Sequence, residues 1–295
     1  MKPLSESLLD KLVPTLFEDE HLLAVGKTAG VDVGGGGGKG TSGLVEMLAS
    51  LRGKGETLRP VNRLGRQESG VLLLGKDIAT VERIRADLRS SRVGQEYVGV
   101  VLGRMREERI RIGERHGASR GRRKKTQRSA SRRASSVSAG APTMVVRLQE
   151  GKNATLVRCH TSVKTTHALR AQLRSAGLRL GGDTTRERSS GGNRTLEVGL
   201  RLTRLSFTHP ASRSKVNLVW KPPQSPKAAL DGRADAVQSA HSALVRRLPC
   251  MTGRDTDSFR LLTGRVEGIR GLAVEKYGEV VVLQVSHETP ELRRA

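Results

Sequence analysis

A run of glycines followed by a lysine is the first feature of this sequence that could bind a phosphate group. Five glycines, Gly34 to Gly38, precede Lys39, and glycine-rich loops that end in lysine hold phosphates in nucleotide hydrolases. The pattern of that loop, GxxxxGK[ST], would require glycine where Val33 stands and serine or threonine where Gly40 stands. Both requirements fail. We therefore interpret the tract as a flexible surface loop and exclude nucleotide hydrolysis.

The two cysteines do not suggest a metal site or a disulfide. Cys159 and Cys250 are far apart, and neither belongs to a CxxC or Cys/His pattern with ligand spacing. A reducing compartment fits this usage. No segment approaches the roughly 18 to 20 consecutive apolar residues of a membrane-spanning helix. We expect a cytoplasmic protein with no metal and no membrane partner.

The charge of the chain favours a polyanionic partner. Its 295 residues include 53 Lys plus Arg and 29 Asp plus Glu, which gives a net charge of +24. No basic amphipathic helix with bulky apolar anchors accompanies this charge, so a membrane surface is disfavoured. The chain has only three Phe, two Tyr and one Trp, too few to line a base-stacking platform. Nucleic acid bound through its phosphates is the leading interpretation.

Alternating and helical patterns predict the elements that would position a site. Leu22 to Lys27 and Gly70 to Lys76 indicate buried strands, and an amphipathic helix is expected from an N-cap at Asp77 to about Arg92. Further strands are predicted at 97–102, 143–148, 155–159, 196–202, 205–208 and 216–220, and a helix at 165–176 that Gly177 stops.

Composition divides the chain into three parts. Residues 14–223 are predicted to form one domain, interrupted at about 117–141 by a disordered basic insertion that cannot bury enough apolar surface to fold. Residues 224–257 are expected to be a linker that carries a helix near 234–248. Residues 258–295 are expected to form a short β piece.

Two strings carry the most specific signal: FEDEHLLAVGKTAG at 17–30 and VNRLGRQESGVLLLGKD at 61–77. They resemble the RluA-type pseudouridine synthases, whose patterns run roughly yEDe-hllvvnKPaG and hRLDrdTSGlLllaKd. The resemblance continues in order through 95–97 (KxY in the family), 165–170 (RTHQIR), 180–183 (lxGD) and 205–210 (LxFxHP). It implies an α/β (α+β) fold with a mixed, mostly antiparallel sheet and flanking helices. It also implies isomerisation of uridine in RNA without cofactor or metal.

The resemblance fails at the reacting group. The family uses one aspartate at or beside the ribose C1′ of a flipped-out uridine, and the third position of its RLD motif is Gly65 here. The family's arginine partner for that aspartate corresponds to Thr165. Removing one member of a buried ion pair costs about 3 to 5 kcal/mol, whereas removing both can be nearly neutral. Glu68 is expected to need a rebuilt loop to reach the same point. We therefore assign no catalytic residue and expect impaired catalysis.

Binding residues follow from the same motifs. The expected substrate pocket consists of Asn62, Arg63, Leu64 and Tyr97, the last being the ring that lies against the base in the family; the alternative for Tyr97 is a core aromatic. The expected phosphate contacts are Lys27, Arg63, Arg66, Lys164 and Arg170 and, in the basic insertion, Arg122, Arg123, Lys124 and Lys125. Solvated surface charge, and for the insertion a solubilising loop, are the alternatives.

The C-terminal string at 259–278, FRLLTGRVEGIRGLAVEKYG, resembles the RLxxGExDGlPGLvVDrYG element of S-adenosylmethionine-dependent rRNA cytosine methyltransferases. No glycine-rich cofactor turn follows it, so methyl transfer is not expected.

Three hypotheses remain open. The leading one is a monomeric RNA-binding protein, specific for rRNA or else tRNA, with impaired catalysis. The alternatives are an active synthase with a substitute carboxylate, and a decaying fusion of a synthase and a methyltransferase.

Overall fold

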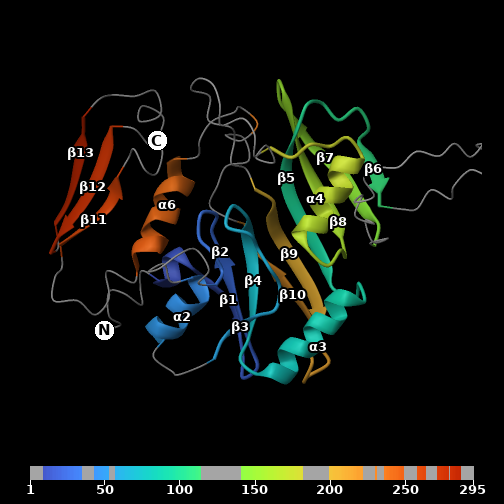
Figure 1. Ribbon diagram of the computed structural model, residues 1–295, viewed down its shortest axis with the longest axis horizontal. Coiled ribbons are helices and arrows are strands. Elements are labelled where there is room, and N and C mark those ends of the chain that lie inside the picture. The colour runs from blue at the N-terminus through green and yellow to red at the C-terminus, as the bar shows by residue number, and fades with distance from the viewer. Residues whose placement is uncertain are drawn as a thin grey trace, which may run out of the picture.

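The computed structural model describes residues 9–34, 43–52, 57–113, 141–181, 199–221, 230, 236–248, 258–263, 271–278 and 280–286. The expected fold class is confirmed, since a large mixed sheet carries flanking helices and a small sheet follows at the C-terminal end (Figure 1). Most of the basic insertion, the glycine tract after Gly34 and the end of the segment at 180–183 lie outside the described residues.

The large sheet joins strands that are distant in sequence. Its main path is β1-β2-β4-β9-β5-β8-β7-β6, with β3 beside β4 and β10 beside β9. Only β4 and β9 pair in parallel; the other pairs are antiparallel. The strands are β1 (Thr15–Glu18), β2 (Leu22–Lys27), β3 (Arg59–Pro60), β4 (Ser69–Gly75), β5 (Gly94–Leu102), β6 (Arg109–Ile112), β7 (Thr143–Glu150), β8 (Ala154–Thr161), β9 (Arg201–Thr208) and β10 (Lys215–Val219).

Strand β9 corrects one sequence prediction. Two strands were expected, at 196–202 and 205–208, but the described part forms one continuous strand, Arg201–Thr208. The residues between the two expected segments keep pairing, because Arg204 faces Glu96 of β5 on one side and Val219 of β10 on the other. Partners on both sides thus outweigh the local break in the apolar pattern.

The parallel contact between β4 and β9 depends on one glycine. Gly70 pairs with Leu202 and has a φ of +134°. A Cβ at this position would lie 2.4 Å from the carbonyl oxygen of Leu202. Only glycine permits this approach and this backbone conformation, so the start of β4 is fixed directly after the loop that carries the candidate site.

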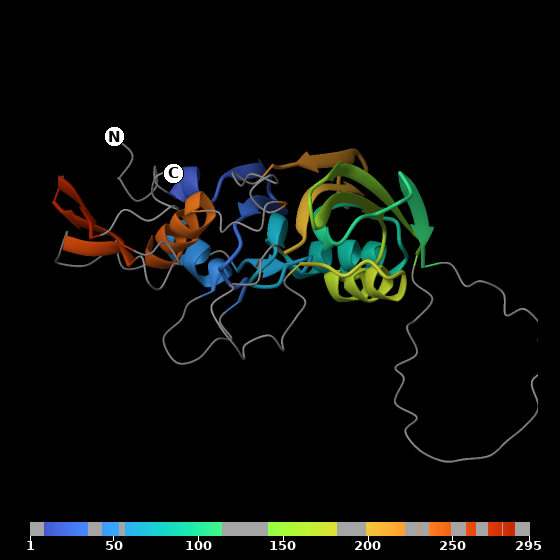
Figure 2. The same cartoon turned by 90° about the horizontal axis from the view of Figure 1, so that it is seen from above.

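Four helices are described over their whole length: α2 (Leu44–Arg52), α3 (Ile78–Arg89), α4 (Thr166–Ser175) and α6 (Ala236–Arg247); residues 9–12 are helical as well. Helices α3 and α4 lie on the same side of the large sheet (Figure 2). The predicted N-cap of α3 is confirmed, since the Asp77 carboxylate accepts the Thr80 N–H at 2.7 Å. Val81, Ile84 and Leu88 are buried as expected, but Ile78, in the first turn, is 61% exposed, so its place in the apolar stripe is wrong. No described helix has the length and apolar character needed to cross a membrane.

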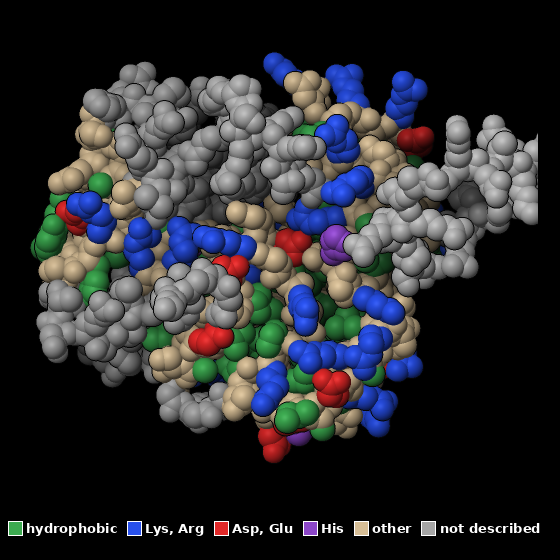
Figure 3. Space-filling model, viewed as in Figure 1, with side chains coloured by type: hydrophobic (Ala, Val, Ile, Leu, Met, Phe, Trp, Pro, Cys, Tyr) green, Lys and Arg blue, Asp and Glu red, His purple; other side chains and the backbone are tan. Residues whose placement is uncertain are grey.

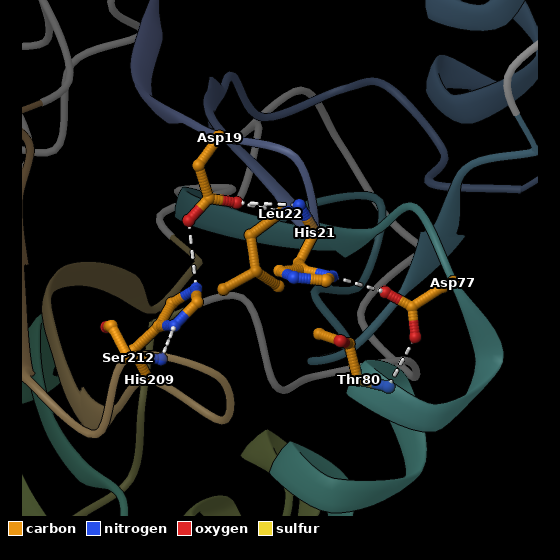
Figure 4. Close-up of polar contacts among 7 residues, drawn as sticks. All are labelled: Asp19, His21, Leu22, Asp77, Thr80, His209 and Ser212. Carbon is orange, nitrogen blue, oxygen red and sulfur yellow. Dashed lines mark hydrogen bonds and ion pairs between the residues drawn. The ribbon is translucent and has the colours of Figure 1, made fainter.

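Three turns at one end of the sheet are tied together by two Asp–His contacts (Figure 4). Asp19 Oδ2 lies 2.8 Å from Nε2 of the buried His209, and Asp19 Oδ1 accepts the N–H groups of His21 and Leu22. His21 Nδ1 lies 3.1 Å from Asp77 Oδ2. The motif residues 18–21 (EDEH) and 209–210 (HP) thus meet here. We call the contacts of Asp19 with His209 and of His21 with Asp77 the clamp of the three turns.

Helix α6 packs against the main domain. Its residues Ala243 and Val245 are buried, and Ser242 Oγ donates to the carbonyl oxygen of Ala29. The helix expected near 234–248 therefore contributes to the core rather than only bridging two parts. The small sheet consists of β11 (Ser258–Thr263), β12 (Leu272–Tyr277) and β13 (Val280–Val285), and β11 lies next to α6 (Figure 1).

Candidate functional site

The loop between β3 and β4, residues 61–68, carries the candidate site and is anchored at its start by Asn62. The Asn62 amide donates to the carbonyl oxygen of Val71 at 2.9 Å, and its side-chain oxygen accepts the Leu73 N–H at 2.8 Å. Both bonds reach across to β4. Asn62 is 7% exposed, so its polar atoms serve the sheet rather than a ligand.

Lys27 holds the other end of this loop. Its Nζ donates to four backbone carbonyl oxygens, those of Thr28 at 3.1 Å, Gly65 at 3.1 Å, Arg66 at 3.4 Å and Glu68 at 2.7 Å. The side chain is fully buried. Burial lowers the Lys27 pKa to about 7, although the nearby Glu68 charge opposes the shift. Lys27 therefore positions the loop, and the expected contact with RNA phosphate does not fit its location.

Gly65 and Glu68 form a tight turn in which the carboxylate folds back over the glycine. The Glu68 N–H donates to the Gly65 carbonyl oxygen at 3.0 Å, and the Gly65 N–H donates to Glu68 Oε2 at 2.7 Å. A Cβ added at Gly65 would have Glu68 Cδ and Oε2 as its nearest neighbours, both at 3.5 Å. Glu68 is 4% exposed. The Glu68 carboxylate therefore lies next to position 65 as the loop stands, although the sequence predicted that the loop would have to be rebuilt for it to reach the point that the family's aspartate occupies.

Helix α4 supplies the positive charge at this turn. Arg170 Nε lies 3.2 Å from Glu68 Oε1. Thr165, at which the sequence placed the family's ion-pair arginine, is instead the N-cap of α4 and accepts the Ala168 N–H at 3.1 Å. Arg170 is thus engaged by a carboxylate, whereas the sequence suggested a phosphate.

Tyr97 lies in β5, the strand between β9 and β8. Its hydroxyl donates to Gln95 Oε1 at 2.8 Å, and Gln95 Nε2 donates to the Val163 carbonyl oxygen at 2.8 Å. Burial, and then the negative charge of Glu68, raise the Tyr97 pKa. The tyrosine is 2% exposed, so in this structure it belongs to the core, the alternative that the sequence left open.

The expected substrate pocket is closed in the described residues. Leu64 is buried like Asn62 and Tyr97, and only Arg63 of the four expected pocket residues is exposed. A uridine could use the other three only after this region opens. The closure follows from packing that the sequence does not reveal, since all three side chains are buried.

The exposed cations among the expected contacts lie in the 61–68 loop and just before α4. Arg63, Arg66 and Lys164 are exposed, and the Arg66 guanidinium lies 3.9 Å from the half-exposed Asp32 carboxylate. Lys and Arg side chains are spread over the face that bears α3 and α4 (Figure 3). The expected contacts Arg122, Arg123, Lys124 and Lys125 lie outside the described residues.

Metal chemistry finds no ligand set in the described part of the chain, where no group of His, Cys, Asp and Glu could hold an ion. The arrangement that sequence reasoning missed is the Glu68–Arg170 pair. The sequence could have indicated this pair, because Glu68 and Arg170 have opposite charges and lie in two motif segments, 61–77 and 165–170, that the family resemblance assigns to one site.

Comparison with known proteins places these elements in a family. The model of the family described as RNA pseudouridylate synthase matches residues 21–175, which include the 61–68 loop, Tyr97 and α4. Ribosomal large subunit pseudouridine synthase C of Escherichia coli K12 is 28% identical over 222 residues, which cover 67% of this chain and 62% of that protein. The protein of the same name from Pasteurella multocida is 38% identical over 97 residues, 33% of this chain and 29% of its own length.

Solved structures agree on the fold. Human RNA Pseudouridylate Synthase Domain Containing 4 has a TM-score of 0.54 at 20% identity and covers 78% of this chain and 95% of its own. Human RNA Pseudouridylate Synthase Domain Containing 1 has a TM-score of 0.51 at 18% identity, with coverages of 73% and 85%. The matched segments span less than two thirds of the curated bacterial relatives.

Proposed function

Because this chain belongs to the RNA pseudouridylate synthase family, we propose that it binds structured RNA, ribosomal RNA first of all, and that its isomerase activity is impaired. The bacterial relatives are named as synthases of the large ribosomal subunit, which supports rRNA over tRNA. The net charge of +24 supplies the attraction to phosphate.

The observation that carries the proposal is the arrangement around Gly65. Exposed cations, Arg63 and Arg66, flank a position that has no side chain. Phosphate contacts need only such cations and are independent of the reacting acid. An uncharged position 65 leaves RNA binding intact and removes the group that the family places at the ribose.

Two measurements on the full chain test the proposal. Binding to bulk 23S-type rRNA should weaken as salt rises, by roughly 0.7 to 0.9 log units per tenfold salt for each phosphate neutralised. Pseudouridine mapping of the same RNA should show conversion at least ~100-fold slower than for a family member with aspartate at this position, the lower end of what a lost acid–base group costs. Salt-independent binding, or conversion at the rate of the aspartate enzyme, contradicts the proposal.

A further inference from the structure

The carboxylate that reaches position 65 comes from another residue of the same turn. We propose that Glu68 takes the role of the missing acid, so that a slow isomerisation of uridine survives at the Glu68–Arg170 pair. This inference rests on the proposed RNA-binding function and names the group that carries its remaining chemistry.

The distances place the two possible acids in one region. Glu68 Cδ lies 3.5 Å from the position of a Cβ on residue 65. The carboxylate carbon of an aspartate would lie one bond, about 1.5 Å, beyond that Cβ. The carboxylate carbons of Glu68 and of an aspartate at 65 would therefore lie about 2 to 5 Å apart, depending on the rotamer. Glu68 is thus three positions from the family's aspartate position in sequence, and its carboxylate is a few ångströms from where the aspartate carboxylate would lie.

The surroundings hold this carboxylate in a defined orientation. One oxygen accepts the Gly65 N–H at 2.7 Å and the other lies 3.2 Å from Arg170 Nε. The backbone of the turn is fixed by Lys27, whose ammonium donates to both the Gly65 and the Glu68 carbonyl oxygens. A reacting group has to be held by a supporting shell of this kind to act at a single atom.

Tyr97 completes a set of three side chains. Burial, and then the negative charge of Glu68, raise the pKa of the Tyr97 hydroxyl. The carboxylate and the arginine meet where helix α4 and the 61–68 loop converge, and the tyrosine of strand β5 lies within range of the charge on that carboxylate. These are the three residue types that the family resemblance associates with catalysis.

The exposed residue next to the carboxylate is Gly65. Glu68 is almost fully buried, whereas Gly65 is exposed. The three nearest atoms to a Cβ at Gly65 all belong to Glu68. The Glu68 carboxylate therefore lies directly beside the exposed glycine, and Arg63 and Arg66 are exposed on the same loop for the flanking phosphates.

The reaction is balanced without a further reactant. The C1′–N1 bond of uridine breaks and its electron pair stays on N1, which leaves a uracil anion and a positively charged ribose. The Glu68 carboxylate stabilises that charge by electrostatic attraction in a site with little water. After the base turns, C5 returns an electron pair to C1′ and forms the C1′–C5 bond. The proton leaves C5 and N1 gains one, so that no atom or electron is gained or lost.

Pseudouridine mapping of rRNA with four proteins tests the inference: the unmodified chain, Glu68→Gln, the double variant Gly65→Asp/Glu68→Gln, and the control Glu82→Gln. Glu82 is an exposed acid on α3, away from the turn. The unmodified chain and the control should convert uridine slowly and equally. Glu68→Gln should be at least ~100-fold slower with RNA affinity within about 2-fold, because the carboxylate acts on the reacting sugar rather than on binding. The double variant should recover conversion.

Two outcomes overturn the inference. One is equal conversion by the unmodified chain and Glu68→Gln; the other is no conversion by the unmodified chain although it binds the RNA, which leaves the proposed RNA-binding function standing. Loss of RNA binding in the unmodified chain would instead contradict that function. If Glu68→Gln fails to melt cooperatively, Glu68→Asp replaces it. That variant keeps the charge, withdraws the carboxylate by one methylene and should lose at least ~10-fold in conversion at unchanged affinity.

Discussion

Glu68 and Arg170 are 102 positions apart in sequence, yet Arg170 Nε lies 3.2 Å from Glu68 Oε1. The carboxylate is nearly inaccessible to water and the guanidinium is half-buried. The pair connects the loop before β4 to helix α4, and through them the two segments in which the family places its acid and its arginine.

Removal of one partner of this pair should cost more than removal of both. Arg170→Met leaves the Glu68 carboxylate buried and unpaired, which should lower the free energy of unfolding by about 3 to 5 kcal/mol. In Glu68→Gln/Arg170→Met neither charge of the pair remains, so the double variant should be less destabilised than the sum of the single changes. Urea unfolding of the four proteins gives the coupling energy, expected at about 1 to 3 kcal/mol.

Arg66→Met is the control for that cycle. Arg66 lies in the same loop, but its side chain is exposed and its ion pair with Asp32 is long, at 3.9 Å. It should change stability by no more than about 0.5 kcal/mol. Strict additivity of the Glu68 and Arg170 changes would show that the two side chains do not interact in solution.

Lys27 should give the fold a distinctive pH dependence. Its pKa of about 7 in the folded protein is below its ordinary value of 10.5, so between these pH values the unfolded chain binds one more proton than the folded chain. Stability relative to Lys27→Met should therefore rise with pH across this window, by up to about 1.4 kcal/mol per pH unit. Thermal melts of both proteins from pH 6 to 10 measure the difference. Parallel pH profiles would count against a buried lysine with a lowered pKa.

Two glycines five positions apart in the chain, Gly65 and Gly70, should respond very differently to replacement by alanine. Gly70→Ala forces a Cβ to within 2.4 Å of the Leu202 carbonyl oxygen at a φ of +134°, so it should destabilise the protein by more than about 3 kcal/mol or prevent folding. Gly65→Ala places a Cβ in ordinary contact at 3.5 Å and should change stability by less than about 1 kcal/mol. Soluble yield and melting temperature distinguish the two, and equal effects would contradict the close approach of β4 to β9.

Charge reversal in the loop should weaken RNA binding and its salt dependence together. Arg63→Glu and Arg66→Glu each remove an exposed cation next to Gly65. Each should reduce the slope of log affinity against log salt by about 1, as expected for one lost phosphate contact. Lys215→Glu makes the same change in net charge at the exposed start of β10 and should leave the slope nearly unchanged. An equal loss in all three variants would mean that net charge, and not this loop, binds the RNA.

The clamp of the three turns should be sensitive to one carboxylate. Asp19 accepts two backbone N–H groups and contacts the buried His209, so Asp19→Ala should cost about 2 to 3 kcal/mol through lost and unsatisfied hydrogen bonds. Glu20→Ala is the neighbouring control. Glu20 is exposed, and its replacement should fall within about 0.5 kcal/mol. A comparable loss in both would indicate that general acidity of this turn, rather than the clamp, matters.

The sequence by itself determined the elements whose patterns are local. The strand at 22–27, the Asp77 cap and the helix that ends before Gly177 follow from apolar spacing, capping chemistry and the conformational freedom of glycine. Motif order was sufficient to indicate the family and its fold. These features depend on residues within one or two turns of each other, so a linear reading captures them.

Only the tertiary structure decided which charged side chains are exposed and which hold the site. Lys27 and Arg170 have the same charge as the exposed Arg63 and Arg66. Lys27, however, donates to backbone carbonyl oxygens inside the protein, and Arg170 pairs with the carboxylate of Glu68. Thr165 caps a helix, and Glu68 reaches the space above Gly65. Burial and partner depend on strands and helices that come together from distant parts of the chain, and a residue's type does not specify them.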